Sequence, residues 1–286
     1  MHLAILRGVF ASICLGTSVS NAATVSQSST AWTALAGNYD SFADQQTGQP
    51  ESDIVGTTAN HGFFTTFNNN GPASNTDGTL GFRMRLDKAG GTTSNPAFTR
   101  VAWVGIDANQ DAVLDVFVGL GLQGSTSVLG IYDAGASANT GPSTTSIAST
   151  PYKTYAVDAT TFNYRPVNFT TDGGTMNDVT TTTSGDPDYY LSFMIDFADL
   201  GAFLRTQSIS ITDTSALRYV VATSTQHNSL NQDLGGVQGG INSTQTWVQL
   251  GGYSALVNAS GATIPEPSGF ATGLLALGTL VLRRKR

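Results

Sequence analysis

A run of oxygen-bearing side chains between Asp107 and Asp115 is the stretch of this sequence best suited to chemistry. It reads Asp-Ala-Asn-Gln-Asp-Ala-Val-Leu-Asp, so side-chain oxygens recur at its first, third, fifth and ninth positions. A tight loop with this spacing can place several hard oxygen ligands around one cation, as Ca²⁺ requires, and its seventh residue can add a backbone carbonyl. The alternative is an Asx-rich turn, in which the same side chains bond the loop's own backbone. The predicted calcium ligands are Asp107, Asn109, Asp111, Val113 and Asp115.

The spacing of this loop and the strand expected after it carry a family resemblance. With Val116-Phe117-Val118-Gly119 following, the loop resembles the calcium loops of FG-GAP and VCBS repeats, which read Asp-x-Asn-x-Asp-Gly-x-x-Asp and run into a strand. Ala112 stands where those loops usually have glycine, and one copy is present, so the resemblance implies a hairpin loop and no propeller. An EF-hand is excluded because its twelfth position would be Val118 instead of a bidentate glutamate. We expect a calcium ion with a structural, stiffening role.

Catalytic constellations are hard to find in this chain. Glu51 and Glu266 are the only glutamates, and the only cysteine, Cys14, falls in the N-terminal leader. There is no Gly-x-Ser-x-Gly elbow, no His-Glu-x-x-His and no phosphate-binding loop. Beyond the leader the histidines are His61 and His227, and nothing in the sequence indicates that they meet. The sequence therefore predicts a non-enzymatic protein, with a secreted hydrolase as the weaker alternative.

Aromatic side chains offer a second kind of binding chemistry. Pyranose rings present C–H faces that stack on exposed Trp or Tyr rings, although in a β-sandwich most aromatic rings lie in the core. The stretch from Tyr189 to Leu200 is also loosely similar to the last strand and turn of DOMON-like carbohydrate-binding sandwiches. A carbohydrate-binding module for exopolysaccharide is therefore the alternative function. The candidates for sugar stacking are Trp32, Trp103, Trp247 and Tyr152, together with Tyr155 and Tyr164.

The distribution of charge limits the partners of this protein. Five of the 13 Lys and Arg residues lie at the extreme ends, so the central part, 23–264, carries eight of them against 19 Asp and Glu residues. An acidic body repels polyanions, and nucleic acid is therefore not expected as a partner. The acidity is nearly all Asp, which favours turns and oxygen-ligand metal loops over helix faces.

A β-rich body must position these side chains. From Thr79 to Asp87 and from Tyr189 to Phe197, apolar residues alternate with polar or small ones, as in half-buried strands. Their apolar faces comprise Leu80, Phe82, Met84 and Leu86, and Tyr189, Leu191, Phe193, Ile195 and Phe197. Other strands are expected at 101–106, 114–122, 127–132, 152–157, 208–212, 217–223 and 246–250, and a short helix at 198–206. We predict an all-β fold, an antiparallel β-sandwich of jelly-roll type.

Both ends of the chain have the composition of processing signals. Arg7 precedes the apolar stretch 8–16 and the small-residue site Ser20-Asn21-Ala22, which predicts a secretory signal peptide cut after Ala22. Pro265-Glu266-Pro267-Ser268 forms a stiff break before the uncharged stretch 269–282. As a helix this stretch spans about 21 Å, less than the roughly 30 Å hydrocarbon core, but a cationic tail can lengthen the span and obeys the positive-inside rule. That tail is Arg283, Arg284, Lys285 and Arg286.

The C-terminal arrangement carries a second resemblance. A Pro-Glu-Pro signal, a Gly/Leu/Ala-rich helix and a terminal Arg/Lys cluster, in this order, resemble the PEP-CTERM sorting domain of Gram-negative bacteria. The resemblance implies cleavage next to the signal by an exosortase, a multi-pass membrane peptidase, so that the helix anchors the protein transiently in the inner membrane. It also implies delivery to the outer surface or extracellular matrix of bacteria that make exopolysaccharide. We expect a surface or matrix protein with a signal peptide at 1–22, a sandwich ectodomain at 23–262 and a sorting segment at 263–286.

Overall fold

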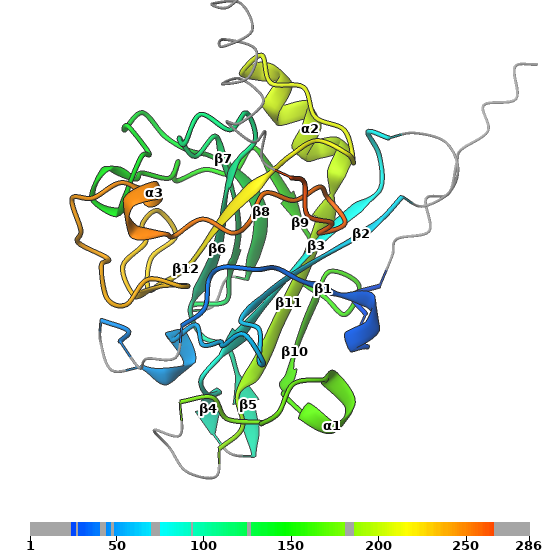
Figure 1. Ribbon diagram of the computed structural model, residues 1–286, viewed down its shortest axis with the longest axis vertical. Helices are drawn as coiled ribbons and strands as arrows, with labels where there is room; N and C mark the ends of the chain where they lie inside the picture. The colour runs from blue at the N-terminus through cyan, green and yellow to red at the C-terminus, as the bar shows by residue number, and fades with distance from the viewer. Residues whose placement is uncertain are drawn as a thin grey trace, which may run out of the picture.

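The computed structural model describes residues 24–26, 28–40, 44–46, 49–69, 75–92, 94–124, 127–180 and 186–265. The strands of this part pair antiparallel, which confirms the all-β class predicted from the sequence. They form two larger sheets and a small hairpin (Figure 1). The hairpin joins β4 (Gly90–Thr92) to β5 (Asn95–Ala97).

The first sheet has the strand order β1-β2-β3-β11-β10. Its middle is β3 (Thr79–Leu86), which pairs with β11 (Tyr189–Asp196) along its whole length. The two segments with the clearest alternation of apolar and polar residues are therefore interior strands, each paired with a neighbour on both sides. The outer strands are β1 (Thr33–Ala34), β2 (Phe63–Asn68) and β10 (Phe162–Pro166).

The second sheet has the strand order β13-β12-β6-β7-β8-β9. From β6 to β9 each strand lies beside the next one in the chain, as expected for strands joined by turn-rich loops. The bounds are β6 (Val101–Asp107), β7 (Val116–Gly121), β8 (Val128–Asp133), β9 (Lys153–Tyr155), β12 (Arg218–Ser224) and β13 (Asp233–Leu234).

Short helices and turns connect these strands. The helix predicted at 198–206 is confirmed as α2 (Phe197–Thr206), which follows β11 without a break. The other helices are α1 (Phe169–Asp172) and α3 (Trp247–Leu250), and the 3-10 turns are η1 (Ser29–Ala31), η2 (Pro50–Ser52) and η3 (Pro142–Thr144).

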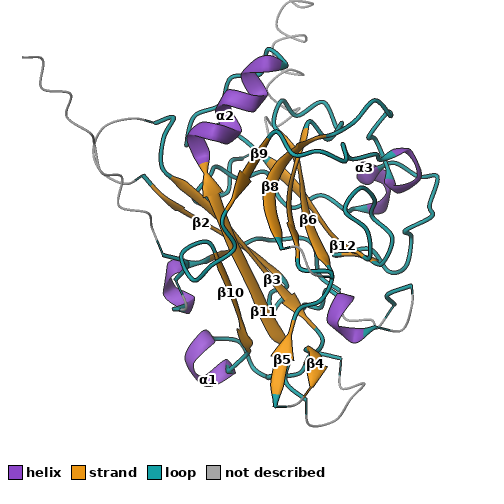
Figure 2. Ribbon diagram, turned by 180° about the vertical axis from the view of Figure 1, so that it is seen from behind, coloured by secondary structure: helices purple, strands orange, loops and turns teal. Residues whose placement is uncertain are grey.

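The two sheets bury one apolar core between them. Figure 2 separates the strands into two groups, with β2, β3, β10 and β11 in one and β6, β8, β9 and β12 in the other. The rings of Phe63 and Phe82, from the first sheet, meet the ring of Tyr219, from β12, at centroid distances of 5.9 and 5.5 Å. The apolar faces predicted for β3 and β11 supply much of this core, namely Leu80, Phe82, Met84, Leu86, Leu191, Phe193 and Ile195, with Phe197 following.

The opposite face of β3 is buried as well, and in this respect the prediction of a half-buried strand is wrong. Arg83 and Arg85 point away from the core, yet they are only 1% and 0% exposed. The Arg83 guanidinium carbon lies 4.3 Å from the ring centroid of Trp32. Arg83 Nη2 donates a hydrogen bond to the carbonyl oxygen of Ser26 at 2.9 Å. The N-terminal segment covers this face at Arg83, whereas Asp188 and Met176 bond Arg85, and the alternation within β3 gives no indication of either contact.

Two of the predicted strands are not present. Residues 246–250 form the start and body of α3, where Thr246 and Gln249 each accept a hydrogen bond from the other's backbone N–H. This reciprocal pair of hydrogen bonds caps the start of the helix. The helix ends at Gly251, whose φ of 69° suits a helix C-terminus. Residues 208–212 form no regular strand, although Ile211 is buried.

The expected transmembrane helix at 269–282 lies outside the described residues. In the part of the chain that the structure describes, no helix combines the length and the apolar character needed to cross a bilayer.

Candidate functional site

The predicted calcium loop lies where the sequence analysis placed it, between two paired strands. Asp107 ends β6, Val116 begins β7, and Ile106 and Val116 are register partners. The backbone N–H of Asp115 donates to the carbonyl oxygen of Ile106 at 2.8 Å and closes the loop. The loop is therefore a hairpin connection at one end of the second sheet.

The oxygen-bearing side chains of this loop accept hydrogen bonds from its own backbone. Asp107 Oδ1 accepts a hydrogen bond from the N–H of Gln110 at 2.6 Å, and Asp107 Oδ2 accepts one from the N–H of Ala112 at 3.0 Å. Asn109 Oδ1 receives the N–H of Asp111 at 3.0 Å, and Asp111 Oδ1 receives that of Val113 at 2.9 Å. Asp115 Oδ2 receives the N–H of Ala108 at 2.7 Å. The Asx-turn interpretation accounts for the bonds of these four predicted side-chain ligands.

Ala112, which stands where FG-GAP and VCBS loops usually have glycine, has a positive backbone φ. Its φ is 69°, in the left-handed region where a side chain adds strain. Gln110 lies in the same region with a φ of 66°. The sharp turn of the motif is therefore kept despite the missing glycine, and the hydrogen bonds to Asp107 hold it.

Arg218 supplies a positive charge to this loop that the sequence analysis missed. Its Nη2 lies 2.5 Å from Asp107 Oδ2, and its guanidinium carbon lies 4.6 Å from the ring centroid of Tyr253. Burial, together with the neighbouring charges of Asp107 and Asp111, raises the pKa of Asp115 to about 6. Among the described residues, Asp107 is the one member of the loop with a cationic partner, so this part of the chain gives the loop an excess of negative charge.

The donor set fits calcium in kind, but its oxygens are turned toward backbone donors. In the described residues, sets of three carboxylates with ligand oxygens within 4.8 Å of one another occur outside this loop. To enclose a cation, the loop would have to bring its side-chain oxygens closer together.

Two such carboxylate sets were not predicted from the sequence. One comprises Asp87, Asp178 and Asp188, and the other comprises Asp40, Asp44 and Asp233. In the first set, Asp188 Oδ2 lies 2.5 Å from Arg85 Nε, and both side chains are fully buried. Each set combines two aspartates of one region with a third from a distant part of the chain, Asp233 in one set and Asp87 in the other. No local spacing could therefore have indicated either complete set.

The second set lies beside a further buried carboxylate, that of Asp53. Asp53, which is 0% exposed, lies beside it and accepts a hydrogen bond from the Asp44 N–H at 3.4 Å. Burial, with the nearby carboxylates of Asp87, Asp44 and Asp40, raises the pKa of Asp53 to about 8. Burial also raises the pKa of Asp233 well above its ordinary value, and the Asp53 carboxylate is the largest charge that adds to this rise.

Comparisons of this chain with family models, curated proteins and solved structures found no match.

The predicted sugar-stacking aromatics are mostly buried. Trp103 and Trp247 are 0% exposed, and Trp32 is also buried, with Arg83 stacked on it. Trp103 lies against Gly119 of the neighbouring strand, where an added Cβ would come within 2.1 Å of the indole ring. Tyr152 is the exposed member of the predicted set, at 51%, and its ring contacts that of Phe203 at a centroid distance of 5.1 Å.

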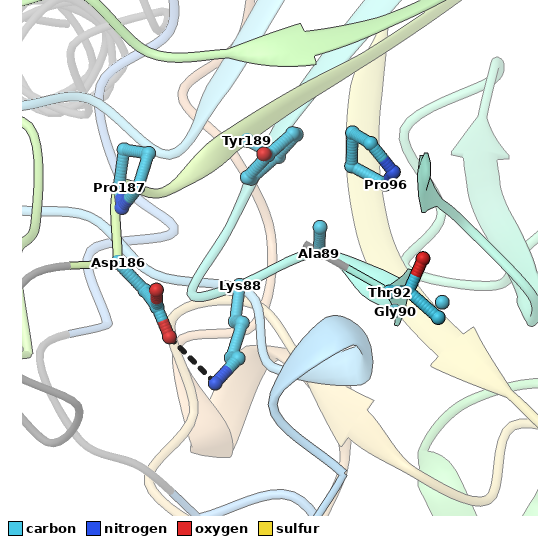
Figure 3. A pocket seen from close by; sticks show the side chains of 9 residues that line it. Lys88, Ala89, Gly90, Thr92, Pro96, Asp186, Pro187 and Tyr189 are labelled. Carbon is cyan, nitrogen blue, oxygen red and sulfur yellow. Dashed lines mark ion pairs between the residues drawn. The ribbon is translucent and has the colours of Figure 1, made fainter. Parts of the chain in front are cut away.

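A surface hollow of about 520 Å³ lies at the β4–β5 hairpin and the start of β11 (Figure 3). Lys88 Nζ and Asp186 Oδ2 form an ion pair at 2.6 Å on one side of it. The Tyr189 ring lines the hollow and stacks on Tyr164, with ring centroids 4.9 Å apart. The sequence analysis had assigned Tyr189 to the inward face of its strand, so its place in the hollow was not predicted.

The processing residues lie mainly outside the described part of the chain. Ala22, Glu266 and Pro267 are among them, as is the basic tail Arg283, Arg284, Lys285 and Arg286. Pro265 is described and exposed. Just before it, Ile264 donates its N–H to the carbonyl oxygen of Leu256 at 2.9 Å, and Thr263 forms a β-bridge with Val257.

Proposed function

We propose that this chain is an exported, non-enzymatic surface or extracellular-matrix protein that an exosortase processes. The observation that carries the proposal is the junction at Pro265. The backbone bonds of the folded body continue to Ile264, and the exposed Pro265 opens the Pro-Glu-Pro signal directly after them. A peptidase can reach a signal placed immediately outside a folded body without unfolding it.

The route and destination belong to the same proposal. The signal peptide directs export, the C-terminal helix holds the protein transiently in the inner membrane, and cleavage releases the body to the outer surface or matrix of a Gram-negative bacterium. The acidic body makes nucleic acid a poor partner, and the PEP-CTERM resemblance implies exopolysaccharide as the associated polymer.

A β-sandwich is the finer fold assignment that we propose within the all-β class. The common core of the two sheets supports it. The chain crosses between the sheets from β3 to β6, from β9 to β10 and from β11 to β12, as in the crossings of a jelly roll. Because β6 to β9 stay in one sheet, a sandwich with three crossings describes the connectivity better than a full jelly roll.

Calcium stiffening of the β6–β7 loop is also part of this proposal. The loop contributes oxygens from Asp107, Asn109, Asp111 and Asp115, with Val113 offering its carbonyl, and carries more negative charge than Arg218 neutralises. A divalent cation would offset that excess and tie the end of β6 to the start of β7.

Mass spectrometry of the protein from its host tests the processing directly. Protein collected from the cell exterior is expected to begin at Ala23 and to lack the four C-terminal basic residues. In cells without the sorting peptidase, and for a Glu266→Ala variant in normal cells, those residues should remain attached. A Glu51→Ala variant serves as the matched control and should be processed normally. Exterior protein that still ends in Arg286 would contradict the proposal.

Carbohydrate binding is the second candidate function, and the hollow beside Tyr189 favours it. A tyrosine ring, an ion pair and glycine backbone offer both a stacking face and hydrogen-bonding groups for a sugar (Figure 3).

Loss of the Tyr189 ring tests this second function. Tyr189→Ala is expected to weaken binding to the host's exopolysaccharide about tenfold, the equivalent of one aromatic stacking contact. Tyr39→Ala, at an exposed tyrosine outside the hollow and outside the predicted sugar-stacking set, is the control and should bind as the unmodified protein does. Equal binding by all three proteins in a pull-down with purified polysaccharide would exclude the hollow as the sugar site.

A further inference from the structure

Four aspartates gather where the N-terminal part of the chain meets the β13 edge of the second sheet. Asp40 and Asp44 lie on the segment before η2, Asp53 follows η2, and Asp233 begins β13. The Gln46 N–H donates to the carbonyl oxygen of Gln232 at 2.9 Å, and Thr223 Oγ1 donates to that of Ser52 at 2.5 Å. Figure 1 shows η2 near the end of β12, in keeping with these bonds.

The oxygens of this cluster have the spacing of ligands around one ion. Asp40, Asp44 and Asp233 each offer a carboxylate oxygen, and these oxygens lie within 4.8 Å of one another. Calcium–oxygen bonds are about 2.3–2.6 Å long, so two ligands of the same ion lie at most about 5 Å apart. Asp40, Asp44 and Asp233 satisfy this limit, and Asp53 lies beside them. Both Asp233 oxygens also accept backbone N–H groups, from Ile54 at 2.6 Å and from Leu234 at 2.7 Å, which hold this carboxylate in place.

Asp53 provides an independent sign of a missing partner. It is 0% exposed, and its Oδ2 has no hydrogen-bond partner among the described residues. Its other oxygen accepts from the Asp44 N–H at 3.4 Å, which places the carboxylate against the cluster. A buried carboxylate oxygen without a donor is costly, and a cation is the partner that would remove this cost.

Three of these aspartates have no basic partner in the part of the chain that the structure describes. Within the described residues, no Lys or Arg forms an ion pair with Asp44, Asp53 or Asp233. The set of Asp87, Asp178 and Asp188 and the β6–β7 loop differ in this respect, because Arg85 pairs with Asp188 and Arg218 pairs with Asp107. Like charges crowded in a buried site favour uptake of a cation.

We propose that Asp40, Asp44, Asp53 and Asp233 bind a calcium ion. An all-oxygen, carboxylate-rich ligand set suits this hard cation better than a transition metal. The ion would join the segment before η2 to the edge strand β13, so its role would be to hold the N-terminal part of the body against the second sheet. This site is separate from the β6–β7 loop and does not depend on the processing proposed for the chain ends.

Calcium titration of the chelator-stripped mature protein tests the proposal. Equilibrium dialysis measures bound calcium, and calorimetry measures Tm with and without the ion. Asp53→Asn and Asp233→Asn are each expected to weaken calcium binding at this site by at least about tenfold. Asp186→Asn, at a half-exposed surface carboxylate, is the matched control and should bind as the unmodified protein does.

The Asp53→Asn variant gives an additional signature. Its amide can donate to the neighbouring carboxylates, so the metal-free variant should melt above the metal-free parent protein, while calcium should no longer raise its Tm. Because Asp53 Oδ2 has no hydrogen-bond partner to lose, this variant remains informative if Asp233→Asn fails to fold.

An Asp111→Ala background separates this site from the β6–β7 loop. In that background the remaining calcium-dependent rise in Tm should persist and should disappear on adding Asp53→Asn. The proposal is overturned if Asp111→Ala alone abolishes all calcium binding, or if Asp53→Asn binds as much calcium as the Asp186→Asn control.

Discussion

Replacing Arg85 by methionine is expected to destabilise this protein by about 3–5 kcal/mol, the usual cost of leaving one member of a buried ion pair without its partner. Arg85 Nε donates to Asp188 Oδ2 at 2.5 Å, and Arg85 Nη2 donates to the carbonyl oxygen of Met176 at 2.9 Å. Both side chains of the pair are fully buried, so water cannot replace the lost guanidinium. Asp87 lies in the same carboxylate set and would add its repulsion once the cation is gone.

Urea unfolding at neutral pH measures this effect, and two further variants separate charge from packing. Arg85→Met combined with Asp188→Asn removes the unpaired charge and is expected to recover much of the lost stability. Arg205→Met, at an exposed arginine near the end of α2, is the matched control and should change stability by less than about 0.5 kcal/mol. A loss below about 1 kcal/mol for Arg85→Met alone would mean that the pair does not stabilise the fold.

Alternation along single strands was enough to predict the centre of the first sheet. Leu80, Phe82, Met84 and Leu86 form one buried face of β3, as the two-residue period requires. The period says nothing about what covers the other face. Arg83 and Arg85 are typical of a solvent-facing side, and the residues that bury them, such as Ser26 and Asp188, lie far away in the chain.

The failure at 246–250 has a local cause. Trp247 and Val248 favour strands by composition, but Thr246 and Gln249 have the spacing of a capping box and Gly251 follows at the C-terminus. These helix signals were therefore visible in the sequence. They outweighed the intrinsic preference of Trp247 and Val248 for a strand.

The candidate sites differ in how much local sequence determines them. The β6–β7 loop is one continuous segment, so its spacing predicted both the hairpin position and the set of oxygen-bearing side chains. Its cation Arg218 comes from another strand and could not be predicted in the same way. The cluster of Asp40, Asp44, Asp53 and Asp233 depends on the return of the chain at β13, so its assembly becomes evident only from the fold.

Replacing Arg218 by methionine is expected to make the stability of this protein more dependent on calcium. In chelator the variant should lose about 2–3 kcal/mol, because Asp107 is fully buried and would keep its charge without a partner. The loss is smaller than for Arg85 because the Arg218 side chain is 20% exposed and water screens the pair in part. Methionine can still pack against Tyr253, which limits the packing change.

Calcium should then replace the missing positive charge at the β6–β7 loop. The rise in Tm on adding calcium is expected to be larger for Arg218→Met than for the parent protein, and Asp111→Ala should cancel the difference. A calcium ion bound at the Asp40 cluster contributes equally to both proteins, so it does not enter this comparison. If calcium raises both Tm values by the same amount, the loop is an Asx turn that Arg218 alone neutralises, and calcium stiffening of the loop is disproved.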